Sequence, residues 1–402
     1  MASLPTSART VMPWAVVVGV VLVALNLRGP IVAPAPVLVT IRDDLGLSTT
    51  TAGFLTSLPV LCFALAGPAA TRVIRRAGPE GAVVLCLLGV LLGTIVRSAG
   101  PTALVLLGTV VIGAAIMVGN IVMPVIIRRD VPWRRAGVVT GLYTASLNVG
   151  SMITSLGTAP LAAVVGWRWA LATWGVLAAA GALYWRGLRR RHAAAAPPAP
   201  TEQAPAEPVS SSAARIGWLL LIAFAGQSFA YYAVSAWLPT LLSDTRGLDA
   251  AASGVTASLF QIFAVAGAFG VPALAARAPG WVPVAVVGAC WVALPIGLLV
   301  APEAYITWSI LGGVGQGGGF TAILSIIARV TRTDREAATV SARVQTGGYV
   351  AATFGAPLAG ALYSATGGWS APLVLVLAAA LAFTVAGVVA ALLARRHHPV
   401  AH

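Results

Sequence analysis

Residues 13–37 read PWAVVVGVVLVALNLRGPIVAPAPV, an apolar run interrupted by two strongly polar side chains, those of Asn26 and Arg28. About 20 consecutive apolar residues are enough for a helix to cross a bilayer, so this run can span one. The run has no small-residue cleavage site and is longer than the core of a signal peptide. We therefore expect it to remain in the protein as a first membrane helix.

Apolar runs of similar length recur along the whole chain. Of its 402 residues, 58% are hydrophobic and 9% are charged, whereas about a quarter of the residues of a soluble domain are charged. This composition excludes a water-soluble globule, and we predict an all-α integral membrane protein. The runs predict twelve transmembrane helices, near residues 13–37, 51–71, 81–97, 102–127, 137–165, 168–187, 216–242, 252–275, 281–301, 304–328, 338–364 and 370–394.

The arginines predict the orientation of the chain. The formal net charge is +14, yet the basic residues are spread over short loops and form no continuous patch, which argues against a nucleic-acid partner. If the amino terminus is cytoplasmic, nineteen Arg lie in inside loops and four lie in outside loops, namely Arg42, Arg97, Arg168 and Arg246. The positive-inside rule then predicts a multi-pass protein of the cytoplasmic (inner) membrane with both termini in the cytoplasm.

The two halves of the chain repeat each other at an offset of 201 residues. For example, Gly53 aligns with Gly254, and Arg128 aligns with Arg329. A repeat of this kind places a substrate site between the halves, near the middle of the membrane. We predict two pseudo-symmetric six-helix bundles joined by a flexible cytoplasmic linker, at residues 1–188, 216–402 and 189–215 respectively.

Arg28 needs an explanation, because an Arg at the centre of a bilayer costs about 2.5 to 3.5 kcal/mol on insertion scales. All eleven Asp and Glu residues lie in loops, in the linker or at predicted helix ends, so we expect no buried salt bridge. One interpretation is that the guanidinium faces a wet cavity and binds an anionic or strongly polar substrate. The alternative is that it binds backbone carbonyls freed beside Pro30, Pro34 and Pro36.

Other polar side chains lie within the predicted helices. For a single Asn or Gln, a hydrogen bond between helices, worth about 0.6 kcal/mol, is an equally good explanation. Arg343 stands two residues before Gln345 and so points about 200° away from it on a helix, which favours a gate or a snorkelling residue. The residues that we predict to line a substrate site are Arg28, Asn26, Asn120, Tyr143, Gln227, Tyr231, Gln316, Gln345 and Tyr349.

Charged residues near the cytoplasmic helix ends are candidates for ion pairs that form and break during transport, although such charges usually serve as topology anchors. The residues that we predict for gating are Arg72, Arg76, Asp130, Asp334 and Arg343. The predicted helices hold no Ser/His/Asp, Cys/His or metal-binding constellation, so we expect no enzymatic activity, metal or cofactor. A membrane-embedded sensor, the alternative of another class, is disfavoured because no soluble segment exceeds the linker.

Several short stretches, in matching order and in matching helices, are similar to one family. They are Asn26-Leu27-Arg28-Gly29-Pro30, residues 119–124 followed by Arg129-Asp130, Gly141-Leu142-Tyr143-Thr144, Trp237-Leu238-Pro239, Gly315-Gln316-Gly317, residues 345–349 and Gly367-Gly368-Trp369. Through them nearly the whole chain resembles the cyanate and 2-nitroimidazole permease branch of the major facilitator superfamily. Arg343 departs from the family pattern, and so does Thr71, which stands where the cytoplasmic gating motif usually has an acid.

The resemblance implies secondary active transport, by alternating access, of a small anion or a small polar nitrogenous compound that is cyanate-like or nitroimidazole-like. The alternative within transport is an efflux pump for neutral drug-like or nitroaromatic compounds. We expect a monomer in the lipid bilayer with a small-molecule substrate as its partner. Proton symport, exchange and facilitated flow all stay open, because the predicted spans hold no carboxylate or histidine to carry a proton.

Overall fold

The computed structural model describes residues 13–192, 211–331 and 334–395, which form helices joined by short turns, with no strand among them. The first half of the chain forms α1 (Trp14–Val32), η1 (Ala35–Val37), α2 (Leu38–Leu45), α3 (Thr49–Leu65), α4 (Gly67–Ser98), α5 (Thr102–Asp130), α6 (Trp133–Thr173) and α7 (Gly175–His192). The second half forms α8 (Ser211–Arg246), α9 (Ala250–Ala275), α10 (Trp281–Val300), η2 (Pro302–Ala304), α11 (Tyr305–Val330), α12 (Asp334–Ala352), α13 (Gly355–Thr366) and α14 (Ser370–Arg395).

Within the described residues, nine helical segments are long and apolar enough to cross a membrane, which confirms the all-α membrane class. Two of the long helices contain a sharp turn, at Gly78 in α4 and at Gly166 in α6, where φ is 70° and 78°. Glycine adopts these angles without a steric penalty. Each turn separates two of the predicted spans, so the turns favour the count of twelve, which stays a prediction.

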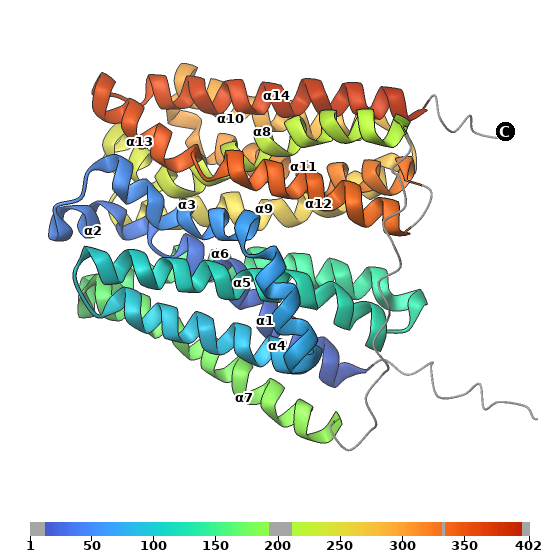
Figure 1. Cartoon of the computed structure of the whole chain (residues 1–402). Helices are drawn as coiled ribbons and strands as arrows, with labels where there is room; N and C mark the ends of the chain where they lie inside the picture. The colour runs from blue at the N-terminus through green and yellow to red at the C-terminus, as the bar shows by residue number, and fades with distance from the viewer. Residues whose placement is uncertain (1–12, 193–210, 332–333, 396–402) are drawn as a thin grey trace, which may run out of the picture.

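The helices on either side of the predicted linker are longer than expected. Helix α7 continues to His192 and α8 begins at Ser211, so residues 189–192 and 211–215 are helical. The rest of the predicted linker, residues 193–210, lies outside the described residues. Figure 1 shows α4, α5 and α7 on one side of the molecule and α8, α10 and α14 on the other. The division into two bundles at the predicted bounds stays a prediction.

The repeat is visible in two equivalent hydrogen bonds. The indole N–H of Trp167 donates to Asp44 at 3.1 Å, and that of Trp369 donates to Asp244 at 2.9 Å. Both bonds join the end of one membrane helix to the turn between two later helices of the same half. The internal repeat of the sequence is therefore also a repeat of structure.

The halves meet in two equivalent close crossings near the end of the molecule that holds α2, which we call the outer end. A Cβ atom at Gly53 would lie 2.8 Å from the backbone of Ala356, and one at Gly254 would lie 2.6 Å from the carbonyl oxygen of Ser155. Such distances exclude any side chain, so glycine lets the backbones touch. Figure 1 shows α3 beside α13 at this end, where the close crossings bring the backbones of the two halves into contact.

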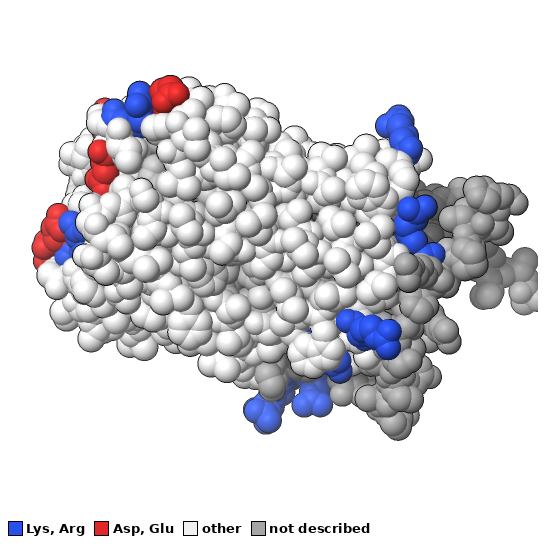
Figure 2. Space-filling model, turned by 90° about the horizontal axis from the view of Figure 1, so that it is seen from above, with Lys and Arg blue, Asp and Glu red and all other residues white. Residues whose placement is uncertain are grey.

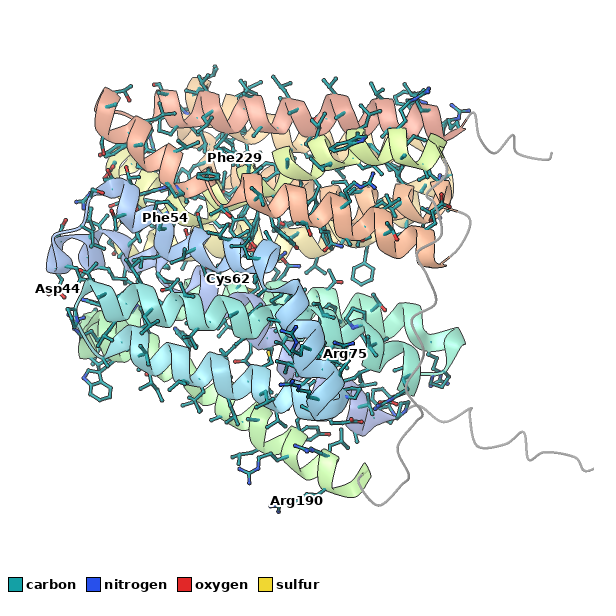
Figure 3. The ribbon with its side chains drawn as sticks, in the orientation of Figure 1. Asp44, Phe54, Cys62, Arg75, Arg190 and Phe229 are labelled. Carbon is teal, nitrogen blue, oxygen red and sulfur yellow. The ribbon has the colours of Figure 1, made fainter. Side chains whose placement is uncertain are left out.

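The two ends of the molecule differ in charge. On the face shown in Figure 2, the Asp and Glu residues gather at the outer end together with some Arg, whereas the described part of the opposite, inner end shows Arg. Figure 3 places Asp44 at the outer end and Arg190 toward the end of α7, away from Asp44. This distribution favours the predicted orientation, in which the inner end faces the cytoplasm.

The count of loop charges placed Arg97 in an outside loop, but the structure places it in a helix. It lies in the last turn of α4, with 1% of its surface exposed, and its Nη1 donates to the carbonyl oxygen of Pro30 at 2.7 Å. The prediction was wrong because the distance of a residue from a helix end does not say which way its side chain turns. The guanidinium of Arg97 turns into the protein, toward α1.

Candidate functional site

Arg28 lies where the two halves of the repeat meet. Its Nη1 donates to Oδ1 of Asn148 in α6 at 2.9 Å, and its guanidinium carbon lies 4.9 Å from the ring centroid of Tyr231 in α8. The amide belongs to the first half and the ring to the second. Arg28 remains half-buried, whereas Asn148 and Tyr231 are 2% and 3% exposed. The charged side chain is therefore held by both halves and keeps part of its surface accessible.

No carboxylate neutralises Arg28 among the described residues. The ion pairs found in this part of the chain join Arg42 to Asp43, Arg129 to Glu80 and Asp130, and Arg168 to Asp44. A neutral amide and an aromatic face fix the position of a guanidinium without cancelling its charge. Arg28 thus keeps its positive charge available for a further partner.

The alternative interpretation was that Arg28 binds backbone carbonyls freed beside the prolines. In the structure, a different arginine bonds one of these carbonyls. The carbonyl of Pro30 is indeed bonded by an arginine, but that arginine is Arg97 of α4. Arg28 points instead toward Asn148 and Tyr231. The backbone carbonyl after Arg28 is therefore bonded by a donor from α4. Arg28 itself contacts Asn148 and Tyr231 where the two halves meet.

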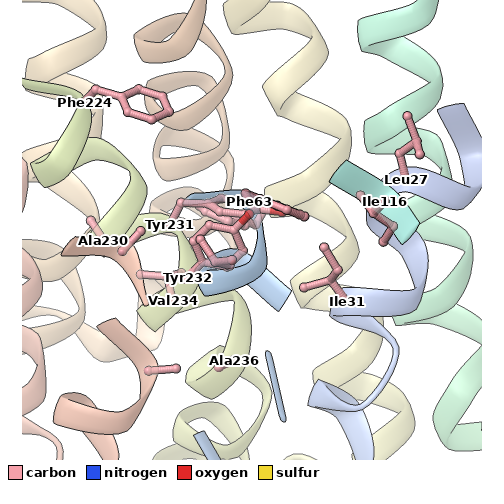
Figure 4. Close-up of a cluster of buried hydrophobic side chains, with 14 of the residues drawn as sticks. Leu27, Ile31, Phe63, Ile116, Phe224, Ala230, Tyr231, Tyr232, Val234 and Ala236 are labelled. Carbon is pink, nitrogen blue, oxygen red and sulfur yellow. The ribbon is translucent and has the colours of Figure 1, made fainter. Parts of the chain in front are cut away.

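Tyr231, whose ring lies against Arg28, has further aromatic rings near it. The rings of Tyr231 and Tyr232 meet edge to face at 4.9 Å, and Tyr349 makes the same kind of contact with Phe63 at 5.4 Å and with Phe224 at 5.1 Å. Figure 4 shows Phe63, Tyr231 and Tyr232 in one cluster of buried side chains, with Ile31 of α1 on the side of the first half. The buried hydroxyl of Tyr231 has no hydrogen-bond partner among the described residues.

The predicted amides separate into two sets. Gln227 donates to the backbone oxygen of Gln316 at 2.9 Å and so joins α8 to α11, while Asn26 donates to Leu22 within its own helix. Both bonds are explained by helix packing alone. Three other predicted residues, Asn120, Tyr143 and Gln345, are half-buried. Gln345 donates to Ser341 of its own helix at 2.8 Å.

Of the predicted gating residues, Asp130 takes part in an ion cluster. Arg129 bonds to Asp130 at 2.6 Å and also to Glu80, and these bonds raise the pKa of Arg129 above its ordinary value. Glu80 did not figure in the sequence-based prediction, although its position after the turn at Gly78 places it beside the end of α5. Arg129 therefore stays charged, and the cluster ties α4 to α5.

The other predicted gating residues lie differently. Arg72 and Arg76 are exposed. Arg343 is also exposed, and its guanidinium carbon lies 5.8 Å from the ring of Trp218, which is 58% exposed. Arg beside Trp at the surface of a membrane helix is typical of the interface with lipid headgroups. The side chain of Asp334 lies outside the described residues.

Asn148 was not among the predicted site residues, and a signal in the sequence could have found it. It stands 201 residues before Tyr349, so the repeat places both side chains at equivalent positions of the two halves. Tyr349 was predicted as site lining from its helix face. The same reasoning applied through the repeat would have selected Asn148.

Apolar helices in two repeat-related groups, with a charged side chain held between them, are typical of a membrane transporter. The family model of the Major Facilitator Superfamily matches residues 16–309. The chain belongs to the major facilitator superfamily.

The relatives agree with this family. The chain is 33% identical over 383 residues to the uncharacterised transporter YycB of Bacillus subtilis (strain 168), with 92% of each chain covered. It is 31% identical over 363 residues to the 2-nitroimidazole transporter of Escherichia coli (strain K12), covering 89% of this chain and 90% of the relative. It is 27% identical to the cyanate transport protein CynX of the same organism over 312 residues, covering 75% and 77%.

Solved structures show the same fold. A bacterial homologue of the human lysosomal transporter Spinster, in an inward-facing and occupied conformation, matches with a TM-score of 0.73 and 16% identity over 99% of this chain and 98% of that chain. This likeness confirms the all-α major facilitator fold that the sequence predicts.

Proposed function

We propose that this transporter moves a small anion or a small polar nitrogenous compound across the cytoplasmic membrane, and that Arg28 is the main contact of the substrate. The observation that carries the proposal is a guanidinium held between the halves by Asn148 and Tyr231, with no carboxylate partner in the described part of the chain. An unpaired cation inside a membrane protein is costly unless something balances it. A substrate that carries negative charge would supply that balance.

The geometry favours a flat substrate with oxygen or nitrogen acceptors at one edge. A guanidinium offers N–H groups in one plane and binds two acceptors at once, and the half-buried rings of Tyr143 and Tyr349 keep some surface for an aromatic contact. A cyanate-like anion offers negative charge and a terminal acceptor atom, whereas the nitro group of a nitroimidazole-like ring offers two oxygens at one edge of a flat ring. The names of two relatives, a 2-nitroimidazole transporter and a cyanate transport protein, agree with these classes.

Efflux of neutral nitroaromatic compounds is a second candidate, which one observation favours. The site is bordered by Tyr231, Tyr232, Phe63 and Tyr349, so an uncharged ring could stack there while its nitro group accepts from Arg28. The direction of transport separates the two candidates: export of a nitroaromatic compound from cells, without uptake of a small inorganic anion, would favour the efflux pump.

Transport proceeds by alternating access in this proposal. The outer end, with backbone contacts at Gly53 and Gly254, supports a conformation that opens toward the inner end. Arg28 is bonded by residues of both halves, so rocking of one half against the other would change its surroundings. The protein acts as a monomer in the bilayer, with both termini in the cytoplasm.

Uptake into proteoliposomes tests the proposal. Small anions and nitroheterocycles are offered to the wild type and to Arg28→Ala, Arg28→Lys and Arg246→Ala. Arg246 is an exposed arginine at the outer end of α8, so its removal controls for the loss of a positive charge. We expect Arg28→Ala to abolish uptake, Arg28→Lys to retain a minor part of it, and Arg246→Ala to behave as the wild type. Native uptake by Arg28→Ala would refute the site.

A further inference from the structure

The backbone of α1 loses a hydrogen bond two residues after Arg28. In a continuous helix the carbonyl of Pro30 would accept from the N–H of residue 34, but residue 34 is also proline and has no N–H. The chain remains helical there, since φ and ψ are −48° and −38° at Ala33 and −68° and −25° at Pro34. The Pro30 carbonyl therefore still points to the place where its donor is missing. A buried carbonyl without a donor is destabilising.

Arg97 supplies the missing donor. Its Nη1 lies 2.7 Å from the Pro30 oxygen, and the side chain is 1% exposed. Its Nε and Nη2 have no hydrogen-bond partner among the described residues, and no ion pair of Arg97 is found there. A buried cation without a carboxylate is an unusual choice for a residue that serves packing alone. The bond to Pro30 is the interaction that this side chain makes.

Helix α1 is also fixed by a second helix, α6, close to the same residues. Gly150 of α6 allows so close an approach that a Cβ atom there would lie 2.3 Å from the carbonyl oxygen of Leu25. The hydroxyl of Thr154, one turn further along α6, lies 3.2 Å from the carbonyl oxygen of Gly29. The segment that carries Arg28 is thus held by α6 before and after it, and by Arg97 of α4 directly beyond it.

Both arginines break the internal repeat. At the offset of 201, Arg28 corresponds to Phe229 and Arg97 corresponds to Leu298. The second half therefore carries neither the central guanidinium nor the donor to the backbone beside it. This shared asymmetry links Arg97 to the function of Arg28 rather than to the general architecture, which both halves share.

We propose that Arg97 is a positioning residue for the substrate site: by bonding the Pro30 carbonyl, it holds the bent part of α1 so that Arg28 points at Asn148 and Tyr231. This role rests on the proposed function of Arg28. Loss of the bond lets the segment after Arg28 move, and the guanidinium then meets the substrate in a less favourable geometry. The consequence is weaker substrate binding in a protein that still folds and still changes conformation.

Three variants separate the hydrogen bond from the charge. Arg97→Leu removes the donor and copies the residue that the second half has at this place, whereas Arg97→Gln keeps a neutral donor. Pro34→Ala combined with Arg97→Leu restores an N–H that can bond the Pro30 carbonyl within α1. The control is Thr109→Val, because the buried hydroxyl of Thr109 bonds to Val105 within its own helix.

The measurement is the KM and kcat of uptake into proteoliposomes, with whichever compound of the anion and nitroheterocycle panel the wild type transports. We expect Arg97→Leu to raise KM by about tenfold with a smaller change in kcat, as expected for the loss of a hydrogen bond from a charged group. Arg97→Gln and the Pro34→Ala/Arg97→Leu double variant should recover most of this loss, and Thr109→Val should match the wild type.

Amide hydrogen exchange gives a second readout that needs no substrate. Peptides covering residues 30–40 should exchange faster in Arg97→Leu and regain protection in the double variant. A native KM in Arg97→Leu, or a defect that Arg97→Gln shares in full, would overturn the role. So would failure of both Arg97→Leu and the double variant to fold.

The outcome for Arg28→Ala keeps the two proposals apart. If Arg28→Ala transports at the native rate, the proposed function fails, whatever Arg97 does. If Arg28→Ala is defective while Arg97→Leu keeps both native KM and native exchange, the positioning role alone fails.

Discussion

Asn148 holds Arg28 without neutralising it. A carboxylate at this place would bind the guanidinium more tightly, yet it would also satisfy the charge that a substrate is proposed to meet. The Oδ1 atom of Asn148 accepts from Arg28 at 2.9 Å and so orients the guanidinium. The amide nitrogen of Asn148 donates to the backbone of Thr144 at 3.0 Å, which fixes the Asn148 side chain itself. Asn148 therefore sets the direction of Arg28 while the charge of Arg28 stays available.

The substitution Asn148→Asp tests this reasoning at a single residue. The new carboxylate should form a salt bridge with Arg28, and we expect uptake of an anion to fall by tenfold or more, since bonds to charged groups are worth about 1.5–3 kcal/mol. Asn148→Ala is the matched control, because it removes the bond and adds no charge. Its uptake should fall less. Equal uptake by Asn148→Asp and the wild type would contradict the role of an unneutralised cation.

Tyr231 offers a second test at the residue scale. Its ring lies 4.9 Å from the guanidinium carbon of Arg28, and its buried hydroxyl lacks a partner in the described structure. Tyr231→Leu removes the ring, and we expect substrate affinity to fall by about 0.5–2 kcal/mol, the range of a cation–π contact. Tyr231→Phe keeps the ring, so binding by isothermal titration calorimetry should stay close to wild type. A larger loss in Tyr231→Phe than in Tyr231→Leu would contradict the contact.

Some of these residues can be predicted from the sequence and others cannot. Arg28 can be selected as a candidate site residue from the sequence. It is an arginine in an apolar run, and no acid in a predicted span could neutralise it. The bond to Asn148 and the inward turn of Arg97 are not, because both depend on which helices lie side by side. Periodicity says which face of a helix a residue occupies, but not which neighbour that face meets.

For the helices as well, the sequence predicts some features and not others. The predicted helix at residues 13–37 is divided into α1 and η1 and is followed by α2, because Pro30, Pro34 and Pro36 remove backbone donors. The prolines predict a bend in this segment. The direction of the bend depends on contacts with Gly150 and Arg97 of other helices, which the sequence does not show. Likewise, the turns at Gly78 and Gly166 fall between predicted spans, and the backbone leaves the helical conformation at each of these glycines.

The glycines at the two outer crossings let helices of the two halves approach closely, so substitutions there should change how the halves pack at the outer end. A valine at Gly53 or Gly254 would collide with the backbone of α13 or α6. Overpacking costs about 1–3 kcal/mol, and 1.4 kcal/mol changes an equilibrium tenfold. We therefore expect Gly53→Val and Gly254→Val to shift the protein toward a state with the outer end open.

Spin labels at Asp43→Cys and Ala365→Cys, in the wild type and in each valine variant, report this shift as longer distances in electron–electron double resonance. The native cysteines are first replaced by serine. Gly270→Val is the control, because a Cβ atom at Gly270 meets nothing within 4 Å. Identical distance distributions in all four proteins would show that these crossings do not hold the outer end closed.

The whole molecule combines a symmetric frame with an asymmetric centre. The bonds of Trp167 and Trp369 and the crossings at Gly53 and Gly254 occur in both halves. Arg28 has no counterpart in the second half, where Phe229 stands. Because the frame repeats, it suits a motion that exchanges the roles of the two halves, while Arg28, which does not repeat, is the cation of the proposed substrate site.

The distribution of ionisable groups over the whole chain bears on energy coupling. The four histidines stand at positions 192, 397, 398 and 402, outside the predicted spans, and no acid lies within a predicted span. For an anion whose charge is constant over this range, we expect proteoliposome uptake without a proton gradient to vary by less than about twofold between pH 6 and 8, since the sequence has no histidine within a predicted span. A sigmoidal change of tenfold would show that the protein itself carries a proton.

The most direct test of the central claim is a cryo-electron microscopy structure with bound substrate, prepared with the compound that the uptake assay selects. We predict substrate density within hydrogen-bonding distance of the Arg28 guanidinium and in contact with the ring of Tyr231. Density at another place, with Arg28 still bonded only to Asn148, would contradict the account.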